Sequence, residues 1–173
     1  MALLVEGARR VGKSYIVEEF AKQEYRSYIL INFAHITKQL KRVFDDYLED
    51  TYNFFLYLQN VTGTPLYERE SLIIFDEVQK YPRARQAIKH LVADGRYDYI
   101  ETGSLVGLNS MAEDILIPSE ERVIPMYPMD FEEFLWALGD EMTMPFICDC
   151  FSNKRPLGPV HRKTMDLFRQ YLI

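Results

Sequence analysis

At 173 residues the chain has the length of a single domain, and its 48% hydrophobic and 27% charged residues are typical of a globular protein. The net charge of −6 excludes a general electrostatic attraction to nucleic acid or anionic lipid, and no apolar run approaches the roughly 18 residues of a membrane span. With no basic N-terminal segment, and with Cys148 and Cys150 as the only cysteines, the sequence predicts a cytoplasmic protein that carries reduced thiols and binds no membrane.

The first predicted element is a short buried strand at residues 3–5, which leads into a loop and then a helix at residues 15–23. The loop spans residues 7–14 and has the spacing of a phosphate-binding loop. We expect Gly7 and Gly12 to adopt positive φ, so that backbone N–H groups converge on a phosphate at the positive end of the helix dipole. Lys13 would contact the β- and γ-phosphates, and Ser14 would bind Mg²⁺. The predicted nucleotide contacts are Gly7, Ala8, Arg9, Arg10, Val11, Gly12, Lys13, Ser14 and Tyr15.

Strand and helix patterns alternate along the following residues. Further strands are expected at 27–33, 71–75, 97–102 and 122–126, the last at a sheet edge because it contains Pro125. Helices are expected at 37–60, 83–93 and 131–138, the last with Asp130 and Glu133 in a capping box. The alternation predicts an α/β fold in which helices cover both faces of a parallel sheet. In such folds the ligand binds beyond the carboxyl ends of the strands.

The last part of the chain, residues 139–173, has helical but no strand patterns and is interrupted by Pro145, Pro156 and Pro159. We therefore expect a phosphate-loop core at 1–138 and a helical extension at 139–173, the start of a lid or linker. The chain begins at its first strand and ends in an amphipathic helical stretch without a stop signal. This pattern predicts a fragment of a longer protein or a truncated open reading frame.

Two carboxylates, Asp76 and Glu77, directly follow the apolar run at residues 72–75. In phosphate-loop enzymes such a strand brings its first carboxylate to the Mg²⁺ shell, through water or through the loop serine, here Ser14. Glu77 would then face the γ-phosphate and activate an attacking water, which favours hydrolysis over transfer to a small-molecule acceptor. The alternative is a strand end that carries two solvated acids.

The strand at 97–102 is followed by Gly103 and Ser104. The hydroxyl of Thr102 or Ser104 could bind the γ-phosphate or the lytic water and thereby sense the nucleotide state. A simple Gly-Ser turn is the alternative. Glu101 is unexpected inside a strand, and it marks either a sheet edge or the site itself.

Arg122 and the basic face of the helix after Glu77 can each be interpreted in two ways. Arg122 either reaches a γ-phosphate of its own or a neighbouring subunit as an arginine finger, or forms a salt bridge with Glu120 or Glu121. The helix after Glu77 has a basic face that either contacts a nucleic-acid backbone or is a solvated, salt-bridged surface. This face consists of Lys80, Arg83, Arg85, Lys89 and His90.

The stretches at 7–14, 76–82, 102–104 and 126–135 together resemble the prokaryotic AAA-type ATPases associated with DUF4143 proteins. The resemblance covers residues 2–138. It implies a P-loop NTPase fold, a three-layer sandwich with a five-stranded parallel sheet in the order 5-1-4-3-2, and ATP as the nucleotide. The resemblance implies that Lys13 and Ser14 contact phosphate and Mg²⁺ and that Asp76 and Glu77 are the Walker B pair. It also implies that Thr102 or Ser104 is the sensor of the nucleotide state.

The chain also departs from that family. Its members usually have a glycine before the arginine that matches Arg122, whereas this chain has Glu121. They also continue into a winged-helix segment and a nuclease-like region, neither of which is present in this sequence. No DNA-binding or nuclease role is therefore carried over from the resemblance.

Two functions are expected from these features. The first is a Mg²⁺-dependent ATPase that couples nucleotide state to a conformational change, with Asp76 and Ser14 as metal ligands. Its predicted catalytic residues are Glu77, Lys13, Thr102, Ser104 and Arg122. The second is a nucleotide-binding switch or interaction module with negligible turnover. The expected partners are ATP and ADP, a protein or a second copy bound through the ATPase face, and nucleic acid bound through the basic face.

Overall fold

The computed structural model describes residues 1–104 and 121–172. The chain divides into two compact units, Met1–Tyr127 and Pro128–Ile173. The division falls before the boundary expected at residue 138. Among the described residues, no helix is long and apolar enough to cross a membrane.

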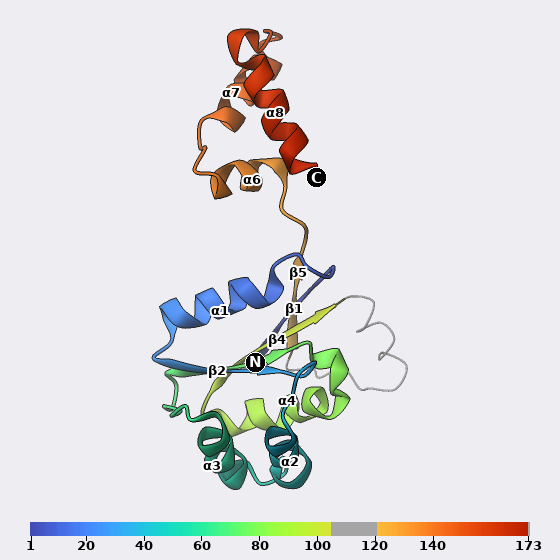
Figure 1. Cartoon of the computed structure of the whole chain (residues 1–173). Coiled ribbons are helices and arrows are strands. Elements are labelled where there is room, and N and C mark those ends of the chain that lie inside the picture. The colour runs from blue at the N-terminus through green and yellow to red at the C-terminus, as the bar shows by residue number, and fades with distance from the viewer. Residues whose placement is uncertain (105–120, 173) are drawn as a thin grey trace. The chain divides into compact units, whose positions relative to one another are not determined.

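The first unit is built on a five-stranded sheet in the order β2-β3-β4-β1-β5, and every pairing is parallel (Figure 1). This is the predicted order, read from the other edge. The strands are β1 (Ala2–Gly7), β2 (Ser27–Asn32), β3 (Ser71–Asp76), β4 (Asp98–Ser104) and β5 (Glu121–Met126). Because all strands run in one direction, the carboxyl ends of β1, β2, β3 and β4 lie at one edge of the sheet, and the predicted site residues gather there.

Helices cover both faces of this sheet (Figure 1). One face carries α1 (Lys13–Glu24), and the other carries α2 (Lys38–Tyr47), α3 (Thr51–Thr62) and α4 (Pro82–Asp94). The helical region predicted at 37–60 is two helices rather than one. The break occurs because the Asp50 side chain accepts a hydrogen bond from the Asn53 N–H and so starts a new helix. A short 3₁₀ turn, η1 (Val78–Lys80), joins β3 to α4.

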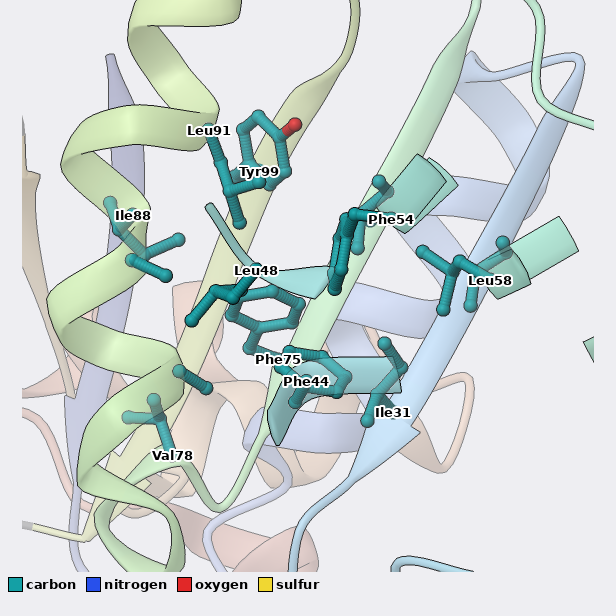
Figure 2. Close-up of a cluster of buried hydrophobic side chains, with 14 of the residues drawn as sticks. Ile31, Phe44, Leu48, Phe54, Leu58, Phe75, Val78, Ile88, Leu91 and Tyr99 are labelled. Atoms are coloured by element: carbon teal, nitrogen blue, oxygen red, sulfur yellow. The ribbon is translucent and has the colours of Figure 1, made fainter. Parts of the chain in front are cut away.

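The larger of two hydrophobic clusters lies between the sheet and α2, α3 and α4. Figure 2 shows Phe44, Phe54 and Phe75 gathered in this layer with Ile88 and Leu91. Phe44 makes edge-to-face contacts with Phe54 and Phe75, with ring centroids 5.1 and 5.7 Å apart. Every residue of β3 is buried, so the strand that carries Asp76 is fixed on both faces.

The second unit contains three helices and no strand among its described residues, as predicted for the end of the chain. They are α6 (Phe131–Ala137), α7 (Thr143–Ser152) and α8 (His161–Tyr171), with a 3₁₀ turn, η2 (Gly158–Val160), before α8. The predicted capping box of Asp130 and Glu133 is confirmed at the start of α6. Phe131 packs edge-to-face on Phe168 at 5.2 Å, which attaches α6 to α8 and places it in this unit.

Candidate functional site

The phosphate loop, residues 7–14, runs from the end of β1 to the start of α1. Gly12 has φ 95° at the N-cap of α1, as expected, but the positive φ predicted for Gly7 is wrong. Arg10 has the second positive φ of the loop, 65°. Gly7 is required for another reason: a Cβ at this position would lie 2.1 Å from the carbonyl oxygen of Met126, at the end of the neighbouring strand β5.

Lys13 is the charged group inside this loop. Its side chain is buried, and Nζ donates hydrogen bonds to the carbonyl oxygens of Gly7 at 3.2 Å and Ala8 at 2.6 Å. The ammonium thus lies against the loop backbone at the N-terminus of α1. A cation together with the free N–H groups of a helix N-terminus favours a bound phosphate. By contrast, Arg9, Arg10 and Tyr15 are exposed.

Asp76 is the centre of a polar network at the end of β3. Ser14 Oγ donates to Asp76 Oδ1 at 2.6 Å, and Thr102 Oγ1 donates to the same oxygen at 2.5 Å. Asn32 Nδ2 donates to Oδ2 at 2.7 Å. Only 2% of Asp76 is exposed, so these donors are what stabilise its charge in the interior.

Asn32 was not predicted from the sequence. It is the last residue of β2 and is in register with Asp76. The predicted strand order already placed β2 beside β3, but a polar residue at the end of a strand carries no signal by itself, and only the register shows that Asn32 reaches Asp76.

Glu77 lies directly beside this network in a left-handed conformation, with φ 56° and ψ 44°. Its backbone N–H donates to Thr102 Oγ1 at 3.2 Å. Its carboxylate accepts a hydrogen bond from Gln79 Nε2, which also donates to Ser104 Oγ at 3.2 Å. Gln79 was likewise missed by the sequence reasoning, since a glutamine two residues after an acidic pair carries no signal by itself.

Glu101 is buried on the opposite face of the sheet from Thr102, since neighbouring residues of a strand alternate between faces. It occupies an interior strand, so the expectation that it marks an edge of the sheet is wrong. Neither carboxylate oxygen has a hydrogen-bond partner within the described part of the chain. Burial, and next the neighbouring Glu121, raise the pKa of Glu101 well above its ordinary value.

Glu121 pairs with Arg85 of α4. Arg85 Nη2 lies 2.9 Å from Glu121 Oε2, and Nε lies 3.3 Å from Oε1. Both side chains are almost completely buried. The basic face proposed for α4 therefore has to be corrected, because Arg85 belongs to the interior rather than the surface.

Arg122 lies far from the phosphate loop. It is in register with Leu3, whereas Met126, at the other end of β5, is in register with Gly7. Four residues of strand span about 13 Å. The structure therefore brings the loop together with Asp76, Glu77, Thr102 and Ser104, but not with Arg122. Of the two salt-bridge partners considered for Arg122, Glu121 is occupied by Arg85, and Glu120 is outside the described residues.

The donor set at this edge of the sheet fits Mg²⁺. No group of three or more His, Cys, Asp or Glu side chains that could hold a metal is found in the described ranges. Mg²⁺ in nucleotide sites needs less, because it keeps several waters and binds one or two carboxylates together with substrate phosphates. Asp76 and the hydroxyl of Ser14, 2.6 Å apart, are the residues that could hold it.

Comparison with known proteins places the chain in a family. No curated protein matches it. Among solved structures, it is similar to PCH-2 from C. elegans, with 14% identity and a TM-score of 0.42 over 87% of this chain. The match covers 39% of the PCH-2 chain, so this chain spans well under half of that structure. A family model described as an AAA domain matches residues 1–135 and supports nucleotide binding and an ATPase-like function. The chain therefore belongs to the AAA domain family.

Proposed function

We propose that the first unit binds ATP together with Mg²⁺, hydrolyses it to ADP and phosphate, and couples the nucleotide state to a conformational change. The observation that carries the proposal is the hydrogen-bonded connection from Ser14 through Asp76 to Thr102, with Glu77 at its end. It joins the phosphate loop to a second carboxylate at the same edge of the sheet.

Each residue has a chemical role in this proposal. The N–H groups of the loop and the Lys13 ammonium balance the charge of the β- and γ-phosphates. Mg²⁺, when bound, supplies further positive charge to the phosphate oxygens. Glu77 accepts a proton from a water molecule while the oxygen of that water attacks the γ-phosphorus. The bond between the γ-phosphorus and the β–γ bridging oxygen breaks, and ADP leaves. Thr102 or Ser104 senses whether a γ-phosphate is present.

The test is to measure Mg-ATP binding and hydrolysis by the whole chain and by two variants. Lys13→Ala should weaken binding, and Glu77→Gln should keep binding but lower kcat by about 100-fold or more, because the general base is lost. Lys22→Ala is the matched control, since Lys22 is on the same helix but is exposed and paired with Glu19. Turnover that survives in Glu77→Gln would contradict the proposal.

A nucleotide-binding switch with negligible turnover is the second candidate. It is favoured by the position of Arg122. This arginine lies at the end of β5 that is away from the phosphate loop, so it is not placed to stabilise a γ-phosphate bound there. The same experiment separates the two functions. Tight binding of ATP by the wild-type chain without turnover would support the switch, and absence of binding would contradict both.

We also propose a cytoplasmic location and association with a protein or a second copy. The support for the location is that Cys148 and Cys150 are free. The support for association is β5, where Val123 and Ile124 are exposed. Nucleic acid has weaker support than the sequence suggested, because the basic face of α4 lacks Arg85.

A further inference from the structure

Gln79 joins Glu77 to the end of strand β4. It lies in η1, the short turn between β3 and α4. One hydrogen of its amide nitrogen is donated to Glu77 Oε2 and the other to Ser104 Oγ, so Nε2 uses both of its donors within the site. The geometry therefore fixes which end of the amide faces Glu77, because the amide oxygen could not donate to a carboxylate.

Glu77 needs such a partner. A glutamate is strained in the left-handed conformation, and a strained residue is kept there only when its surroundings hold it. Thr102 holds the backbone N–H of Glu77, but that contact leaves the side chain free to rotate. The contact from Gln79 is what fixes the carboxylate.

The two contacts of Glu77 lead back to the phosphate loop by separate routes. Thr102 donates a hydrogen bond to the same Asp76 oxygen as Ser14, which is the last residue of the loop. Gln79 leads to Ser104, which is in register with Gly7, the first residue of the loop. A change at either end of the loop can thus reach Glu77, through its backbone or through its carboxylate.

We propose that Gln79 is a positioning residue that holds the Glu77 carboxylate and couples its orientation to Ser104. This inference rests on the proposed hydrolysis and adds to it the residue that makes the general base depend on the sensor. Gln79 acts through Glu77 and Ser104 rather than on the nucleotide. Its loss should therefore lower kcat and leave nucleotide affinity almost unchanged.

The remaining atom of the amide, Gln79 Oε1, is buried and has no hydrogen-bond partner among the residues that the structure describes. A buried acceptor without a donor destabilises the fold. The glutamine is therefore not explained by stability alone. Its place in the site is explained by the two hydrogen bonds that Nε2 makes.

The first experiment measures kcat and the affinity for ADP in Gln79→Met, which has a similar shape but no amide. We expect kcat to fall about 10- to 100-fold, with ADP affinity within about 2-fold of wild type. Gln86→Met, at an exposed position of α4, is the matched control and should change neither. Adding Ser104→Ala to Gln79→Met should lower kcat no further, because Ser104 acts through Gln79. Normal turnover in Gln79→Met, or an equal loss of affinity and kcat, would overturn the inference.

The second experiment needs no nucleotide. Exchange of the Gln79 side-chain amide hydrogens with water, followed by NMR, should be slower than that of Gln86 for both hydrogens. Ser104→Ala should remove the difference for one hydrogen only, because the other is donated to Glu77. If the Gln79 amide exchanged as fast as that of Gln86, the inference that Gln79 connects Glu77 to Ser104 would be overturned. If the wild-type chain had no turnover, the proposed hydrolysis would fail, and this measurement would still decide whether Gln79 holds Glu77.

Discussion

At the scale of single residues, the side chains of Glu101, Glu121 and Arg85 place three ionisable groups together in the interior of the first unit. Two carboxylates share one guanidinium in the interior, and Arg85 is already paired with Glu121. An unpaired buried carboxylate is strongly disfavoured in its charged form. Glu101 is therefore expected to keep its proton to a higher pH than an exposed glutamate does.

This cluster predicts a dependence of stability on pH. The pKa of Glu101 is raised by folding, so the folded protein keeps a proton that the unfolded chain loses above the ordinary value of 4.5. The stabilisation is fully present below that pH and is lost as the pH rises toward the folded-state pKa. Glu101→Gln has no proton to lose at this position. Its free energy of unfolding should therefore exceed that of wild type by an amount that grows from about pH 5 to about pH 8.

Denaturant unfolding at several pH values checks this expectation. Glu24→Gln, at an exposed position of α1, is the control and should follow the wild-type curve. If Glu101→Gln also ran parallel to wild type across the whole range, Glu101 would not be the group that titrates.

At the scale of elements, the close approach of β5 to β1 shapes the start of the phosphate loop. The carbonyl oxygen of Met126 lies where a side chain at Gly7 would begin. Gly12 is different: a Cβ there would meet only the flexible Met126 Cε at 3.6 Å, and the residue is constrained by its φ of 95°. Glycine is thus required at the two positions of one motif for different physical reasons, steric contact at Gly7 and positive φ at Gly12.

The difference predicts separate effects of alanine at the two positions. Gly12→Ala should lower the free energy of unfolding by about 1–2 kcal/mol, the cost of a left-handed alanine. Gly7→Ala should cost more, about 2–4 kcal/mol, because backbone must move and the pairing of β5 with β1 is disturbed. Thermal unfolding of both variants tests this, and a smaller loss for Gly7→Ala would contradict the steric explanation.

Elements and motif residues could be predicted from the sequence because they depend on local patterns. The apolar run at 72–75, the loop spacing and the capping box at Asp130 all belong to single stretches of chain, and the family resemblance supplied the strand order. Gln79 and Asn32 could not be found in this way, because each binds a residue at the end of another strand, Ser104 or Asp76, and neither amide side chain belongs to a motif. Gly7 was assigned the wrong cause because its constraint comes from β5, more than a hundred residues later.

At the scale of the whole molecule, the site residues are confined to one of the two units. The phosphate loop, Asp76, Glu77, Gln79 and Ser104 all lie within Met1–Tyr127. The hydrogen bonds that join them are also formed within that unit. Nucleotide binding should accordingly depend on the first unit, whatever the second unit contributes to turnover.

A chain that ends at Tyr127 tests this division. We expect it to bind ADP with an affinity within about 2- to 3-fold of the full chain, since no binding residue is removed. Its cooperative unfolding would show that the sheet and its helices form an independent core. Loss of binding by a folded 1–127 chain would mean that residues 128–173 complete the site. A chain ending at Ala137 keeps α6 and would then show whether that helix is the missing part, since the boundary expected from the sequence included it.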